Sequence, residues 1–155
     1  MATLRPLTQA QFKVQISGAG LSAIYFTTFS GFKDQASTSQ YADGQNARIK
    51  NLVGPRTLQP MTLSVPYDPG DAAQQQLISN WKYINCAEFT VVITPIRCTD
   101  TGTLAGDVTE LVESQLIFND SRLTSLSFMN VDRTSSNVSM LELGFISDDY
   151  KYATV

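Results

Sequence analysis

The chain has 155 residues, with 11 basic and 14 acidic side chains, a formal net charge of −3 and no histidine. This length predicts one domain, residues 1–155, with one core. The acidic balance argues against a protein that grips nucleic acid through its phosphates. No run approaches the ~20 apolar residues of a membrane span, so we expect no membrane insertion.

The first predicted elements form a β-hairpin. Phe12, Val14 and Ile16 alternate with polar residues, which is the period of a half-buried strand. The glycines of the segment 17–20 suit a turn. A second strand is expected from about Ala23 to Phe32.

A long excursion follows, from about residue 35 to residue 56. It is polar and contains the turn pair Asp43-Gly44, and Gly54-Pro55 is expected to end a strand that begins at Arg48. The excursion exceeds the length of an ordinary connection, and such segments are usually functional or disordered. We therefore expect a protruding loop or hairpin that is mobile in the free subunit.

One α-helix is predicted over about residues 69–84. Asp68 is the expected N-cap, with Pro69 in the first helical position. Leu77, Trp81 and Ile84 fall on one apolar stripe, so the helix is expected to pack against the core through them.

Strands dominate the rest of the chain. Alternating runs predict strands over 61–65 and 89–95, and three more over about 108–118, 123–130 and 138–146. The sum is a mainly β fold, an antiparallel β-sandwich or barrel with one packed helix.

No residues suggest catalysis or a cofactor. Without histidine, the usual activation of a serine or cysteine nucleophile and the usual zinc ligands are missing. Cys86 and Cys98 lack metal-ligand spacing, so free, inert thiols are expected. We predict no metal, no cofactor and no enzyme activity.

The order of features resembles the bacteriophage tail tube protein family, over roughly residues 11–149. The resemblance rests on Phe12-Lys13-Val14-Gln15-Ile16, Phe29-Ser30-Gly31-Phe32, Tyr41-Ala42-Asp43-Gly44 leading into Arg48 and Lys50, Met61-Thr62-Leu63-Ser64-Val65, the helix with Trp81, Leu123-Thr124-Ser125-Leu126, and the strand from Val138 to Leu143. The second glycine that usually follows Gly44 is Gln45 here. No single motif is specific to this family, but the order of the whole series is more specific than any one of them.

The resemblance implies a structural subunit that forms six-membered rings, which stack head to tail into a hollow tube. The excursion would reach the neighbouring ring, and its inter-ring contacts are expected from Tyr41, Asp43, Gly44, Asn46, Arg48, Lys50 and Asn51. From Asp100 to the C-terminus nine carboxylates face only three basic residues, so charge complementarity between copies is one interpretation and a solvated surface is the other. Surplus acid would also suit a lumen that must not hold DNA.

The same resemblance implies the partners and the location. They are a tail sheath, a tape-measure protein, a baseplate initiator and a tail terminator, with double-stranded DNA passing through the lumen without specific binding. The place would be a contractile virion tail assembled in the cytoplasm of the bacterial host. The alternatives are the inner tube of a contractile injection or secretion system with protein cargo, and a monomeric β-sandwich binding module.

Overall fold

The protein is mainly β-structure, in antiparallel sheets. The computed structural model describes residues 12–18, 20–42, 44–45, 48–84, 87–99, 107–129 and 131–152. The elements in this part are β1 Phe12–Gly18, β2 Leu21–Phe26, β3 Thr28–Ser30, β4 Asp34–Ala42, β5 Ile49–Leu58, β6 Met61–Pro66, α1 Ala72–Asn80, the 3₁₀ turn Trp81–Tyr83, β7 Phe89–Thr99, β8 Asp107–Glu110, the 3₁₀ turn Val112–Ser114, β9 Leu116–Ser127, β10 Met140–Ile146 and β11 Lys151–Tyr152. The predicted fold class is confirmed: a sandwich-like fold with one helix and a protruding hairpin, and without a closed barrel.

Two layers form the sandwich and share β9. The strand order is β2-β1-β7-β9-β10-β6-β3, with β11 added to β9 and β8 added to β7. The first half of β9 pairs with β7, and its second half, from Arg122, pairs with β10. Between the halves, Asp120 has a φ of 54° and the Ser121 hydroxyl donates to the Phe118 carbonyl at 3.1 Å. This local distortion lets one strand pass from the first layer, around β1 and β7, to the second layer, β10, β6 and β3.

The core lies between the two layers. Val91 of the first layer and Leu63, Leu141 and Phe145 of the second are completely buried. The rings of Phe118 and Phe145 meet edge to face, with centroids 5.8 Å apart. The alternation seen in the sequence therefore fills one apolar interior from both layers.

The helix begins later than the sequence suggested. Asp71, not Asp68, is the N-cap, because its carboxylate accepts a hydrogen bond from the Ala73 amide at 3.0 Å. Asp68 instead accepts from the Gly70 amide and closes the preceding turn. The α-helix also ends at Asn80 and continues as a 3₁₀ turn, so the predicted range 69–84 was too long at both ends.

Several strand boundaries also differ from the sequence prediction. Gly54-Pro55 does not break β5, which runs from Ile49 to Leu58, and β7 continues beyond Pro95 to Thr99. The expected second strand is split at Thr27 into β2 and β3. The expected runs 108–118 and 123–130 are instead β8, a 3₁₀ turn and one long β9. Strand pairing overrides the local breakers in β5 and β7.

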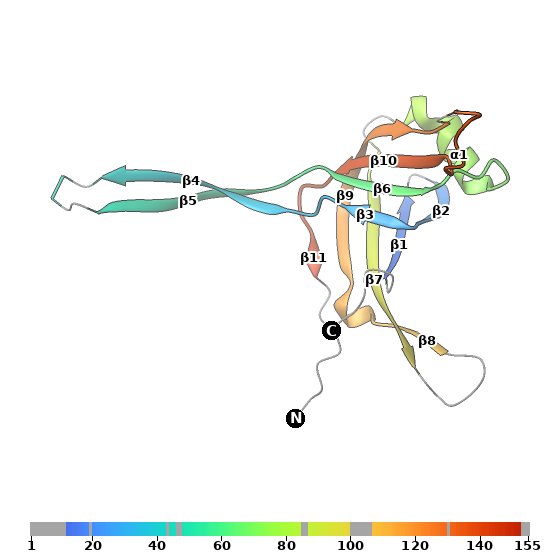
Figure 1. Cartoon of the computed structure of the whole chain (residues 1–155). Helices are drawn as coiled ribbons and strands as arrows, with labels where there is room; N and C mark the ends of the chain where they lie inside the picture. Colours follow the sequence, from blue (N-terminus) through green and yellow to red (C-terminus); the bar gives the residue numbers. More distant parts are fainter. Residues whose placement is uncertain are drawn as a thin grey trace.

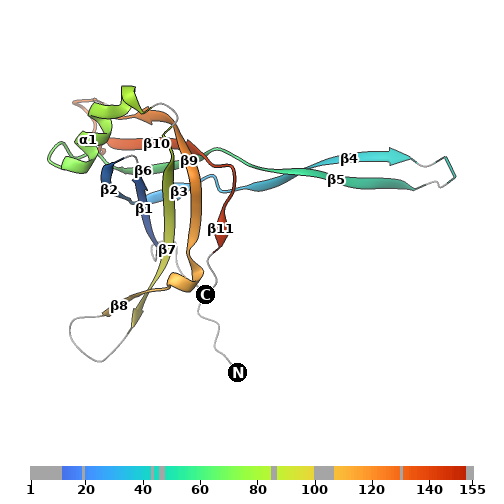
Figure 2. The same ribbon diagram turned by 180° about the vertical axis from the view of Figure 1, so that it is seen from behind.

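The excursion after β3 is a β-hairpin, β4 with β5, which extends far from the sandwich (Figure 1). It leaves the body from β3 and returns into β6, both strands of the second layer. The view from behind shows it equally free of the body (Figure 2). We call this hairpin, residues 34–58, the arm.

Candidate assembly interfaces

The arm is a two-stranded sheet with side chains on two faces. Directly paired residues share a face, so Ala42 with Ile49 and Thr38 with Val53 lie on one face. Tyr41 with Lys50 and Ser39 with Leu52 lie on the other. The period of two along each strand produces this division.

Both faces of the arm expose apolar side chains. Val53 is 70% exposed and Ile49 61% on the first face, while Leu52 and Tyr41 are exposed on the second. An isolated two-stranded hairpin is at best marginally stable in water. The arm therefore has the character of a segment that is buried in an assembly.

Most residues predicted for inter-ring contact lie on the outer half of the arm. Tyr41, Lys50 and Asn51 are strand residues, Gly44 lies in the turn and Arg48 precedes β5. The Lys50 ammonium lies 5.9 Å from the centroid of the Tyr41 ring. The predicted contacts Asp43 and Asn46 lie outside the described residues.

Hydrogen bonds and ring contacts fix the base of the arm to the body. The Tyr150 hydroxyl donates to the Asp34 carboxylate at 3.1 Å, and Arg56 approaches the same carboxylate at 3.7 Å. The hydrogen bond to Asp34 raises the pKa of Tyr150, and the negative charge of Asp34 adds to that effect. The ring of Phe32 packs between Tyr150 and Phe118, at 5.2 and 5.8 Å. The arm thus has a defined direction at its root.

The outer face of the second layer is rich in hydroxyl groups. Its hydroxyl residues are Thr28, Ser30, Thr62, Ser64, Thr124, Ser125 and Ser127. A bulge in β9 places both Thr124 and Ser125 against Gly144, where a Cβ would collide with the Ser125 hydroxyl. Among the described residues of β3, β6, β10 and the second half of β9, from Arg122, the charged residues are Glu142 and Arg122. We call this surface the hydroxyl face; sequence reasoning missed it, although Ser and Thr at alternate strand positions were its signal.

The layer that carries the hydroxyl face has open edges. In the described part of the chain, β3 pairs with β6 on one side, and no strand pairs with its other side. Residues 122–127 of β9 likewise pair only with β10. Unpaired strand edges are templates for pairing with another chain.

The described carboxylates of the C-terminal third lie on more than one surface. Glu110 is bound by Lys13 at 2.8 Å, and this hydrogen bond raises the pKa of the lysine. Asp132 accepts hydrogen bonds from the hydroxyl and amide of Thr134, which lower its pKa. Glu142 is on the hydroxyl face. The acidic residues that are close in the sequence therefore contribute to several different surfaces of the protein.

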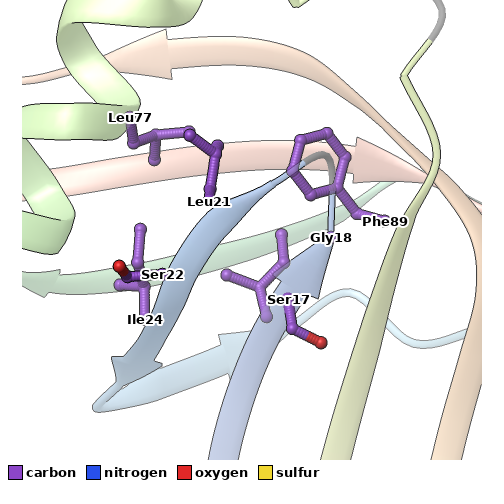
Figure 3. A pocket seen from close by; sticks show the side chains of 8 residues that line it. Ser17, Gly18, Leu21, Ser22, Ile24, Leu77 and Phe89 are labelled. Carbon is purple, nitrogen blue, oxygen red and sulfur yellow. The ribbon is translucent and has the colours of Figure 1, made fainter.

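One small cavity lies among the described residues of the sandwich. A cavity of about 10 Å³ lies between α1, the β1–β2 hairpin and β7, lined by Leu77, Ile24 and Phe89 among others (Figure 3). That volume holds at most one water molecule. Within the same described part, no group of three or more acidic or cysteine side chains is placed to hold a metal, and no helix has the length and apolar character to cross a membrane.

Comparison with known proteins gives a clear match in structure alone. No protein-family model matches the chain, and no curated protein sequence does. A chain in the baseplate structure of the anti-feeding prophage superposes with a TM-score of 0.76 at 15% identity, over 99% of both chains. A chain in the sheath-tube complex of the PVC extracellular contractile injection system gives 0.71 at 19% identity, over 97% of this chain and 93% of that one. The tail tube of SPP1 gives 0.58 at 10% identity, over 97% and 80%. At these identities the likeness establishes a shared fold.

Proposed function

We propose that this chain, which has the fold of tail-tube proteins, is the subunit of a tube in a phage tail or a contractile injection machine. Its role is structural and not catalytic. The observation that carries the proposal is the arm, which projects from the body with apolar side chains on both faces. A monomer gains nothing from such a segment, whereas a tube of stacked rings buries it against the next ring.

The rings are six-membered and close through the second layer. Its open edges, at β3 and at residues 122–127 of β9, pair between neighbouring copies, and closure leaves no edge of this layer exposed. Four strands per subunit, β3, β6, β10 and β9, then contribute to one continuous barrel. Its inner surface is the hydroxyl face, which water wets well and whose two kinds of charge, at Glu142 and Arg122, offset each other.

The tube works with a sheath, a tape-measure protein, a baseplate initiator and a tail terminator, in a tail assembled in the host bacterium. Two cargoes are possible for the tube. The sequence favours double-stranded DNA, in a virion, and protein is the second candidate, because a hollow tube can carry it equally well. The higher TM-scores of the injection-system chains, 0.71–0.76 against 0.58 for the SPP1 tail tube, favour an injection machine over a phage tail. Gene context separates the two, because capsid and terminase genes accompany a phage tail.

Electron microscopy of the purified protein tests the proposal. Rings or tubes with a central channel are expected in negative stain, alongside monomer in light scattering. A protein that stays monomeric at high concentration in the presence of tail initiator proteins would overturn it and favour the β-sandwich binding module. That alternative predicts an exposed aromatic cluster on the sandwich that binds a ligand.

A further inference from the structure

A second exposed apolar surface lies in the connection between β9 and β10. In its described part, residues 128, 129 and 131–139, Val131 is 82% exposed, and Met129 and Val138 are exposed as well. We call this connection the end loop. This connection therefore exposes three large apolar side chains, which water solvates poorly.

Contacts with the body fix the shape of the end loop. The ring of Phe128 packs on Tyr67 with centroids 5.7 Å apart, and the Tyr67 amide donates to the Ser139 carbonyl at 2.8 Å. Met129 has a φ of 60°, in the left-handed region that large side chains rarely adopt. These contacts hold the two ends of the end loop on the body, at Phe128 and at Ser139.

The end loop lies at the opposite end of the sandwich from the arm. Tyr67 anchors it next to α1, and Figure 1 shows α1 at one end of the body and the arm projecting from the other. The arm and the end loop therefore cannot meet within one subunit. They face each other when copies are stacked head to tail along the direction in which the arm projects.

The charges of the two surfaces are complementary. The outer half of the arm carries Arg48 and Lys50 against a single acidic residue, Asp43. Around the end loop, in residues 67–84 and 128–139, the acidic residues are Asp68, Asp71 and Asp132, and the basic residues are Lys82 and Arg133. Opposite net charge orients an encounter, and apolar burial then supplies most of the affinity.

We infer that the end loop is the receiving surface for the arm of a second copy in the adjacent ring, with Val131 against the face of the arm that carries Ile49 and Val53. This inference rests on the head-to-tail stacking proposed above. One projecting end and one receiving end form a heterologous contact, which propagates along the tube.

Cross-linking tests the contact directly. Val53→Cys and Val131→Cys are combined in a background in which Cys86 and Cys98 are serine, assembled tubes are treated with a short bis-maleimide, and the products are separated by denaturing electrophoresis. A ladder well beyond the dimer is expected, because each subunit links to one copy above and one below. Either single variant cannot exceed a dimer, and the pair Val53→Cys with Val112→Cys is the matched control, since Val112 is another exposed valine on a different surface.

The outcomes separate this inference from the proposed function. If tubes form and the ladder appears with Val112 but not with Val131, the receiving surface is elsewhere while the tube stands. If the wild-type protein forms no tubes, the proposed function fails and the inference with it.

A second measurement covers the case in which the cysteine variants do not assemble. Folded Val131→Asp subunits retain an arm but lack a receiving surface, so adding them to wild-type protein is expected to shorten the tubes. Val53→Asp subunits should shorten them from the other end. Unchanged tube length with Val131→Asp, when Val53→Asp shortens the tubes, would overturn the inference.

Discussion

Trp81 is a packing residue at the end of α1, on the stripe that also holds the buried Leu77. It is only partly buried, and it packs against the core together with Ile84. Trp81→Ala should therefore lower the free energy of unfolding by about 2–3 kcal/mol, less than the ~3–5 kcal/mol lost with a fully buried aromatic. Chemical denaturation measures this difference. Tyr83→Ala is the control, because Tyr83 is 82% exposed and its loss should change stability by less than about 0.5 kcal/mol.

Gly31 makes the step from β3 to the arm possible. Its φ is +90°, and a Cβ there would lie 3.0 Å from the Pro60 carbonyl oxygen. Gly31→Ala should lower the free energy of unfolding by roughly 1–3 kcal/mol, since backbone strain and a collision with the main chain add together. Gly20 also has a positive φ, +73°, but no atom lies within 4 Å of its Cβ position, so Gly20→Ala measures the strain alone. Equal losses in the two variants would show that the collision relaxes.

The arm as an element depends on how its root is held. The hydrogen bond from Tyr150 to Asp34 requires a protonated phenol, and its effect is to raise the pKa of Tyr150 above the ordinary value of about 10. A raised pKa means that this contribution to stability is fully present below pH ~10 and is lost as the pH rises through the pKa of the folded state. Hydrogen exchange at the Gln59 amide, which donates to the Lys33 carbonyl beside the root, should accelerate in Tyr150→Phe at neutral pH. The wild-type protein should lose the same protection, measured against an unstructured amide at the same pH, only at alkaline pH. Identical exchange in both proteins at neutral pH would contradict the role of this bond.

The tip of the arm should matter for assembly and not for folding. Arg48 and Lys50 are exposed, so reversing both to glutamate should leave the unfolding of the monomer nearly unchanged. Tube elongation should be impaired, because the reversed charges would face the acidic surroundings of the end loop. Tube length and yield by electron microscopy measure this. Normal tubes from Arg48→Glu, Lys50→Glu would contradict it, and restored elongation with Asp132→Lys on the partner surface would strengthen it.

At the scale of the whole molecule, the proposed tube assigns an inside and an outside to the sandwich. Thr62 on the hydroxyl face and Tyr25 on the outer face of the first layer are both exposed in the subunit. With the native cysteines replaced, Thr62→Cys in assembled tubes should react with a small maleimide and resist a bulky polymer-linked maleimide. Tyr25→Cys should react with both reagents, and both variants should do so as monomers. Fast reaction of Thr62→Cys with the bulky reagent in tubes would place the hydroxyl face outside.

The sequence by itself determined the fold class, the one helix, the hairpin β1–β2 and the protruding excursion. These follow from the period of the apolar residues and from turn chemistry, which are local properties. It also pointed to the outer half of the excursion as a contact region, through its length and its basic residues. The role of those residues stays a prediction.

Only the tertiary structure decided how far the strands run and which surfaces they form. Gly54-Pro55 reads locally as a break, yet β5 continues through it with a shift of register, because β4 pairs on both sides, at Val53 and at Arg56. The sequence predicted two strands where the structure has the single long β9. It is continuous because its first half pairs with β7 in one layer and its second half pairs with β10 in the other. The hydroxyl face and the end loop also needed the tertiary structure, since each gathers side chains whose neighbourhood is set by register and by packing between distant segments.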